Sequence, residues 1–281
     1  MEKFKIVADS SADLLFVEGV PFAYAPLKII TTEKEYVDNA DLDVKEMVDA
    51  LSIYKGKSST SCPNPEDWLQ AFGEAESVFC LTITGTLSGS YNSAVLAKRL
   101  YEEKYPGRRV FVINSLSTGP EMKLIAEYVR KMILNNESYE NICEKTTQYM
   151  QNTGLLFMLE SMRNLANNGR ISSVVAKAVG LLGIRIVGTA SEIGDLQLLD
   201  KCRGQQKALE AMFNRMKEFG FNGGRVRLAH CFNEKAAKTL RDMILTEFPC
   251  ADIEVYTCRG LCGFYAEKNG MLVGFEKNIQ A

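Results

Sequence analysis

The stretch LTITGTLSGSYNSAVLAKRL, residues 81–100, contains the end of one secondary-structure element and the start of another. Residues 78–84 form an unbroken apolar run, which predicts a strand, and residues 88–104 carry a helical pattern. The loop between them, TGTLSGS, holds glycines and hydroxyl side chains and no histidine. Strand, small-residue loop and helix in this order predict one βα unit of a mostly parallel sheet that is covered on both faces.

The rest of the chain continues this alternation. Before residue 153, the patterns predict further strands at 4–9, 22–30 and 109–115, and helices at 43–54, 64–75, 121–135 and 139–151. After it, they predict strands at 155–160, 184–192, 195–202, 225–231, 252–258, 261–267 and 271–276, and helices at 161–168, 172–182, 205–218 and 233–247. The sequence IGD joins two of these strands in a hairpin, so the second sheet is predicted to be mixed.

The length of 281 residues allows two domains of ordinary size. We therefore expect an α/β fold with two α/β domains. Residues 1–154 form the first domain, with a mostly parallel sheet and flanking helices, and residues 155–281 form the second, with a mixed sheet and helices.

The charge balance excludes some partners. The chain has 33 Lys and Arg against 35 Asp and Glu, without long blocks of either sign, so nucleic acid and anionic membranes are not expected as partners. No apolar run is long enough to predict a membrane span, and the first residues lack the features of a signal peptide. We expect a cytoplasmic protein whose partner is a small molecule.

Cysteine and histidine do not indicate a metal site. Among the eight cysteines, Cys258 and Cys262 are the only close pair, and no second pair or nearby histidine completes a tetrahedral site. The sequence contains one histidine, His230, at the end of a predicted strand, and we interpret it as structural. We expect no metal and no cofactor.

The loop of the opening stretch has the features of an anion site. Ligands of open α/β sheets bind at the carboxyl ends of strands, where helix N-termini present free N–H groups. Ser88 is predicted to cap the helix, so Gly89 and the residue after it would offer amides to a carboxylate or a phosphate. Thr60 and Ser61 precede another helix start and could converge on the same group. The simpler interpretation of the loop is an ordinary N-cap with packing glycines.

Six motifs in order resemble those of the DegV family over essentially the whole chain: KIVADSSADL, TSCPNPEDW, TGTLSGSYNSA, VINSLSTG, NLANNGRISS and KCRGQQKAL. The resemblance implies a protein that holds a long-chain fatty acid between two domains. It implies that Thr60 and Ser88, with Ser61 and Gly89 beside them, hold the carboxylate. It also places Arg170 and Arg203 at the entrance, where they could contact a kinase or the transferred phosphate.

Some bacterial relatives are the acyl-carrying subunit of fatty-acid kinase, and they present the bound carboxylate to a separate kinase protein. By this resemblance the chain is a carrier and not itself an enzyme. Many relatives carry a C-terminal T-H-T-G-P-G element, whose histidine reaches the carboxylate. Here that histidine is absent, so either Tyr265 or Arg259 takes its place or the head group is held more loosely. Asn114 stands where the usual residue is an aspartate.

Two other classes of function remain open. A serine hydrolase or acyltransferase could use Ser88, but it would need His230 as its base, and no G-x-S-x-G elbow surrounds Ser88. A phosphate or nucleotide binder is the third hypothesis, although the loop lacks the GK[ST] ending of a P-loop. Asp9 or Ser10, at the end of the first strand, could also line the site through hydrogen bonds to the residues that hold the anion. The lipid carrier is the favoured hypothesis.

Overall fold

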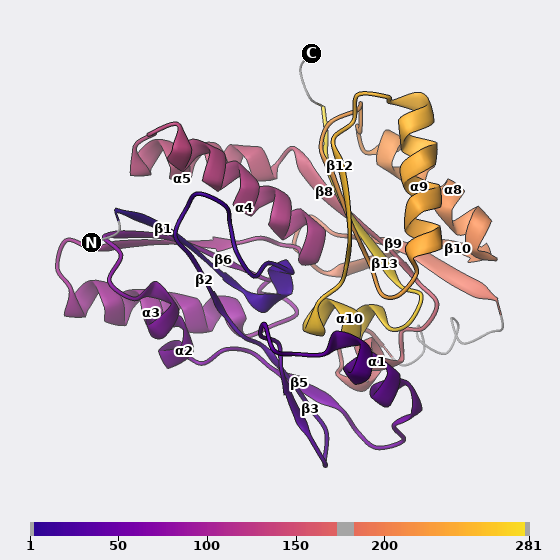
Figure 1. Ribbon diagram of the computed structural model, residues 1–281, viewed down its shortest axis with the longest axis horizontal. Coiled ribbons are helices and arrows are strands. Elements are labelled where there is room, and N and C mark those ends of the chain that lie inside the picture. Colours follow the sequence, from indigo (N-terminus) through magenta and orange to yellow (C-terminus); the bar gives the residue numbers. More distant parts are fainter. Residues whose placement is uncertain (1–2, 173–182, 279–281) are drawn as a thin grey trace.

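The computed structural model describes residues 3–172 and 183–278. Its N-terminal half contains a four-stranded parallel sheet in the order β2-β1-β6-β7 (Figure 1). The strands are β1 Phe4–Asp9, β2 Phe22–Ala25, β6 Ser77–Thr82 and β7 Arg109–Asn114. As predicted from the unbroken apolar run, every residue of β6 is buried.

Helices cover both faces of this sheet. One face packs against α2 Pro65–Phe72 and α3 Ser90–Lys104, and the other against α4 Gly119–Leu134 and α5 Tyr139–Met150. The start of α2 is fixed by a capping box in which the Asn64 side chain accepts hydrogen bonds from Glu66 N–H and Asp67 N–H, and the Asp67 carboxylate accepts one from Asn64 N–H. The predicted βα units are confirmed.

The C-terminal half contains a six-stranded sheet in the order β10-β9-β8-β13-β11-β12. The strands are β8 Thr153–Leu159, β9 Ile184–Ala190, β10 Leu196–Arg203, β11 Val226–His230, β12 Ile253–Thr257 and β13 Met271–Glu276. Only β11 and β12 pair in parallel, so the predicted mixed sheet is confirmed. Helices α8 Gln205–Glu218 and α9 Glu234–Glu247 pack on one face. The change of sheet falls close to residue 154, and the division into two domains there stays a prediction.

A small antiparallel sheet, in the order β4-β3-β5, lies below the four-stranded sheet in the view of Figure 1, next to α10. It consists of β3 Lys28–Ile30, β4 Glu35–Val37 and β5 Ser59–Ser61. The remaining described helices are α1 Val44–Ile53 and the short helices η1 Ser10–Ala12, α6 Arg163–Asn167 and α10 Gly260–Ala266. The prediction of one strand over 22–30 is wrong. Pro26, which has no N–H to donate, ends β2, and β3 begins in a different sheet.

The predicted strand at 261–267 is also wrong, because these residues form most of α10. The N–H groups that open this helix are bound by carboxylates from the N-terminal half, which a local pattern does not reveal. The helix expected at 172–182 falls almost entirely outside the described residues. Within the described ranges, none of the helices combines the length and apolarity needed to cross a membrane.

Candidate functional site

A cavity of about 300 Å³ lies between the four-stranded sheet, the six-stranded sheet and α10. Most of its wall consists of apolar side chains drawn from both halves of the chain: Leu27, Ile83, Leu155, Phe157, Leu159, Leu165, Ala190, Leu196, Leu261 and Leu272. A volume of this size is at the lower end of the range for ligand pockets.

Strand alternation explains the apolar wall on the C-terminal side. Leu155, Phe157 and Leu159 of β8 point to the cavity, whereas Leu156 and Met158 between them pack against α8 and α9. One strand therefore contributes to a packed core on one face and to an open space on the other.

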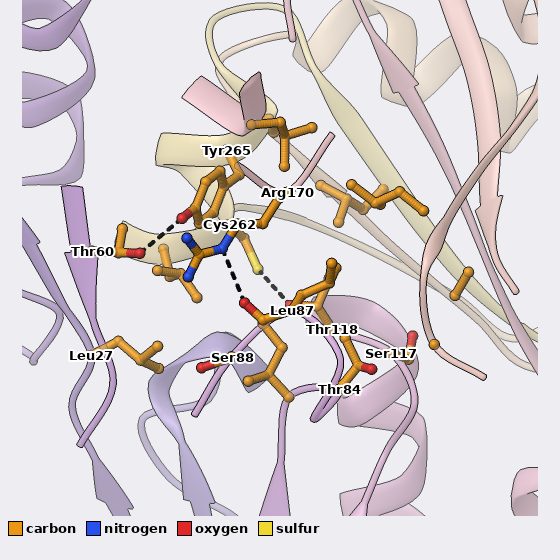
Figure 2. A pocket seen from close by; sticks show the side chains of 18 of the residues that line it. Leu27, Thr60, Thr84, Leu87, Ser88, Ser117, Thr118, Arg170, Cys262 and Tyr265 are labelled. Atoms are coloured by element: carbon orange, nitrogen blue, oxygen red, sulfur yellow. Dashed lines mark hydrogen bonds between the residues drawn. The ribbon is translucent and has the colours of Figure 1, made fainter. Parts of the chain in front are cut away.

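Thr60 and Tyr265 form a polar contact in the wall of the cavity (Figure 2). Thr60 lies on β5 and Tyr265 on α10, and their hydroxyl oxygens are 2.8 Å apart. Ser61 and Cys62 follow Thr60 on the same wall. Burial raises the pKa of the Tyr265 hydroxyl, so this group stays protonated at neutral pH and can donate a hydrogen bond.

The loop after β6 brings Ser88 and Gly89 to the same cavity, as the strand-end rule predicts. Ser88 is not the N-cap residue of α3, because Gly89 occupies that position. The Ser88 hydroxyl instead accepts a hydrogen bond at 3.2 Å from the N–H group of Ser90, two residues further along the chain. The two hydroxyl clusters also do not share one sheet, since Thr60 lies in the small sheet.

Asp9 stabilises this loop through hydrogen bonds. Its carboxylate accepts hydrogen bonds from the Ser90 hydroxyl at 2.6 Å and from Ile83 N–H at 2.9 Å. Asp9 is fully buried, and this burial raises its pKa. Neither Asp9 nor Ser10 lines the cavity, and the Ser10 hydroxyl accepts a hydrogen bond from Leu27 N–H.

Arg170 lies where the cavity meets a second, more polar groove of about 760 Å³. Its guanidinium donates hydrogen bonds to the carbonyl of Leu87, at 3.0 Å, and to the carbonyl of Asn168. Leu87, Ser88 and Gly89 also line both spaces. In Figure 2, the Arg170 side chain extends between Tyr265 and Leu87. The site thus contains a cation, in addition to the hydroxyls and amides that the sequence predicts.

Other predicted residues lie elsewhere. Arg203 is exposed at the far end of β10 from Leu196, about 23 Å away along an eight-residue strand. Arg259 does not line the cavity and donates a hydrogen bond to the carbonyl of Asn39. His230 is buried at the end of β11 and lines neither the cavity nor the groove, so the structure does not bring it to Ser88.

Several polar residues of the cavity wall were not identified from the sequence. Thr84, Ser117 and Thr118 follow β6 and β7, so the strand-end rule could have found them. Cys262 could not be found in this way, because its segment was predicted to be a strand. Its thiol lies 3.6 Å from the Thr118 hydroxyl and donates to the carbonyl of Ser11, and burial raises its pKa well above the usual value. Among residues 3–172 and 183–278, no cluster of three His, Cys, Asp or Glu could hold a metal ion.

Comparison with known proteins places the chain among close relatives. Residues 3–278 match the family model described as an uncharacterised protein of the DegV family. A DegV domain-containing protein of Streptococcus pneumoniae is 42% identical over 277 residues, which cover 97% of this chain and 99% of the relative.

Solved structures with the same fold carry fatty acids. A DegV family protein from Eubacterium eligens, loaded with heptadecanoic acid, is 41% identical and superposes with a TM-score of 0.96 over 98% of this chain and 100% of its own. The fatty acid kinase (Fak) B3 protein of Streptococcus pneumoniae, loaded with linoleic acid, has the same identity, coverage and TM-score. A DegV family protein from Ruminococcus gnavus, refined with vaccenic acid, is 28% identical with a TM-score of 0.90 over 98% of this chain and 100% of its own.

Proposed function

Since this chain belongs to the DegV family, we propose that it binds one long-chain fatty acid in the cavity between its two large sheets. The observation that carries the proposal is the cavity itself, a mainly apolar space whose wall also contains hydroxyl side chains and Arg170. The fatty acids bound by relatives that share 41% of its residues support the same ligand class.

The tail supplies most of the binding free energy. Each buried methylene contributes about 0.8 kcal/mol, so a chain of about sixteen carbons can contribute on the order of 10 kcal/mol before ordering costs. The cavity wall offers the aliphatic and aromatic contacts that this requires.

The head group is oriented by hydrogen bonds. We propose that the Thr60, Ser88 and Tyr265 hydroxyls donate to the carboxylate, with the Gly89 amide beside them and Arg170 supplying a positive charge at the boundary. Donors to a charged oxygen contribute about 1.5–3 kcal/mol each. Nothing in this set removes a proton, because no carboxylate or histidine is found among the described residues that line the cavity. An ester hydrolase would need such a base.

We further propose that the chain is a carrier that presents the carboxylate to a separate kinase protein. The polar groove shares Leu87, Ser88, Gly89 and Arg170 with the cavity, so a carboxylate held at this boundary has one side toward the groove. A phosphoryl donor held by another protein could approach from there. The likeness to the Fak B3 protein supports this role. Arg203, exposed on β10, stays a predicted kinase contact.

Native mass spectrometry of the protein purified from cells tests the ligand, since a bound acid adds its own mass. The variant that combines Thr60→Ala with Ser88→Ala should raise the Kd for hexadecanoic acid about tenfold or more, because it removes two donors to a charged group. Ser59→Ala, exposed on the same strand as Thr60, is the matched control and should leave the Kd unchanged. Equal affinity in the double variant would rule out this head-group site.

A further inference from the structure

Helix α10 is held at its N-terminus by two carboxylates from the other half of the chain. Arg259 N–H donates to Asp13 at 3.0 Å, and Gly260 N–H and Leu261 N–H donate to the two oxygens of Asp38, each at 2.9 Å. Asp38 is fully buried and Asp13 almost so. Free N–H groups at a helix start favour an anionic partner. These bonds therefore fix where the helix begins.

The contact between Asp38 and Gly260 is so close that a side chain at position 260 would displace the Asp38 carboxylate. A Cβ atom placed on Gly260 would lie 2.6 Å from the Asp38 carboxyl carbon. The neighbouring Arg259 guanidinium is only a weak partner, with its Nε 3.9 Å from Asp38. The amides of α10 are thus the main partners of this carboxylate.

Asp38 and Thr60 are carried by the same small sheet. Asp38 directly follows β4, Thr60 lies on β5, and both strands pair with β3 between them. On the opposite side, Gly260 and Tyr265 are carried by the same short helix. The small sheet and the residue after it therefore contact α10 at two points. Asp38 accepts hydrogen bonds from the first amides of the helix, and Thr60 forms a hydrogen bond with the Tyr265 hydroxyl near the end of the helix.

We infer that Asp38 is a positioning residue of the fatty-acid site, which acts through α10 to set the Tyr265 hydroxyl against Thr60. This inference rests on the proposed function. Asp38 itself does not line the cavity. It orients a donor for the acid head group, whereas the part of the apolar wall that β8 contributes does not depend on it.

Asp38→Asn tests this role, because an amide keeps the shape of the side chain but has one acceptor oxygen where two N–H groups need one each. Binding of hexadecanoic acid and of hexadecanol is measured on delipidated protein by displacement of a fluorescent fatty acid. We expect the Kd for the acid to rise about tenfold and that for the alcohol to change less than twofold. If Asp38 had only a structural role, the variant would bind both ligands more weakly by the same factor, and that outcome would overturn the inference.

A double-mutant cycle with Tyr265→Phe tests whether the effect of Asp38 on acid binding passes through Tyr265. If Asp38 acts through Tyr265, adding Asp38→Asn to Tyr265→Phe should cause little further loss of acid affinity, whereas additive losses would contradict the inference. If Asp38→Asn does not fold, Gly260→Ala, which displaces the same carboxylate, should cause the same selective loss of affinity for the acid. Asp41→Asn, exposed in the same loop, is the control. Failure of the unmodified protein to bind hexadecanoic acid would instead reject the proposed function.

Discussion

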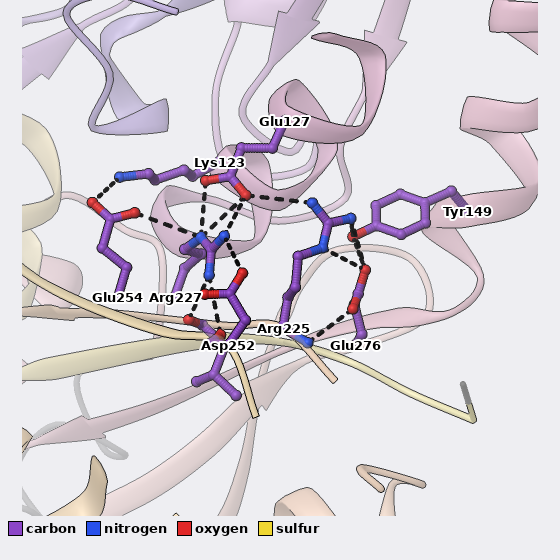
Figure 3. Close-up of polar contacts among 9 residues, drawn as sticks. Lys123, Glu127, Tyr149, Arg225, Arg227, Asp252, Glu254 and Glu276 are labelled. Atoms are coloured by element: carbon purple, nitrogen blue, oxygen red, sulfur yellow. Dashed lines mark hydrogen bonds and ion pairs between the residues drawn. The ribbon is translucent and has the colours of Figure 1, made fainter. Parts of the chain in front are cut away.

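Two of the contacts between the halves of the chain differ in character. At one, Glu127 of α4 faces Arg227 and Arg225 of the C-terminal half (Figure 3). Arg227 is mostly buried and lies 2.8 Å from Glu127 and 3.1 Å from Asp252, while Arg225 lies 2.7 Å from Glu276. At the other, around α10, the main contacts are carboxylates on amides, paired hydroxyls and a cavity.

The difference teaches how an apolar cavity stays open between two sheets. Apolar walls that face each other tend to close, because interiors pack with few voids. On the α4 side the two halves are joined by the ion pairs with β11 and by close packing of α4 on β13, where Gly274 lies against the backbone of Pro120. Among the described residues, the α10 side has no such dense contact along the cavity and leaves room for a ligand.

Arg227→Met should have the largest effect, because it leaves Glu127 without its closest cation in a half-buried position. We expect the free energy of unfolding of delipidated protein to fall by about 3–5 kcal/mol. Urea denaturation measures this change, and the Kd for hexadecanoic acid of the folded fraction should stay the same. A stable variant with weakened lipid binding would show that this contact belongs to the site.

Asp13→Asn should change how stability depends on pH. Burial, and then the charge of Asp38, raises the pKa of Asp13 to about 7 in the folded protein. The folded state therefore holds a proton that the unfolded state releases near pH 4, and this contribution to stability is lost as pH rises toward and through 7. Between pH 5 and pH 8 the loss amounts to about 2–3 kcal/mol, which the variant should lack.

Urea midpoints of both proteins across this pH range measure the effect. The neighbouring groups Asp38 and Cys262 are present in both proteins, and the variant removes only the Asp13 carboxyl. Parallel pH profiles would mean that Asp13 titrates at its ordinary pKa.

Leu155→Phe and Leu156→Phe compare the two faces of β8. Leu155 borders the cavity, so a larger side chain should occupy ligand space and shorten the preferred acid by about two carbons, worth about 1.6 kcal/mol. Leu156 lies in the packed core against α8, where the same change should destabilise by about 1–3 kcal/mol. Native mass spectrometry and urea denaturation distinguish the two; equal destabilisation would mean that the cavity face is as tightly packed as the core.

Lys45→Ala should have the smallest effect. Lys45 forms an exposed pair with Asp49 one turn away on α1, at 2.6 Å. Exposed pairs of this kind contribute little, because water and salt screen them. Neither the urea midpoint nor lipid affinity should change measurably, and a clear loss would show that α1 takes part in holding α10.

The long elements could be predicted because their signals are local. The buried run of β6 and the capping box at Asn64 each lie within a few adjacent residues. The hairpin between β9 and β10 was likewise visible from its turn. The strand-end rule also placed the Ser88 loop at the ligand cavity, since carboxyl ends of parallel strands share one edge.

The site around Tyr265 could not be predicted in the same way. Three-residue strands such as β4 and β5 carry too few side chains to show a period, and they exist because β3 pairs with both. Helix α10 is buried on nearly all sides, so its residues show no helical stripe and were assigned to a strand.

The sequence by itself determined the alternating α/β fold, the mixed second sheet and the hydroxyl-rich loops, because each depends on neighbouring residues. Only the tertiary structure decided that Tyr265 faces Thr60, that Cys262 joins the cavity wall and that Arg203 does not. The physical reason is distance along the chain. The carboxylates that set the position of α10 come from residues more than two hundred positions away, and their effect exists only once both halves have folded together.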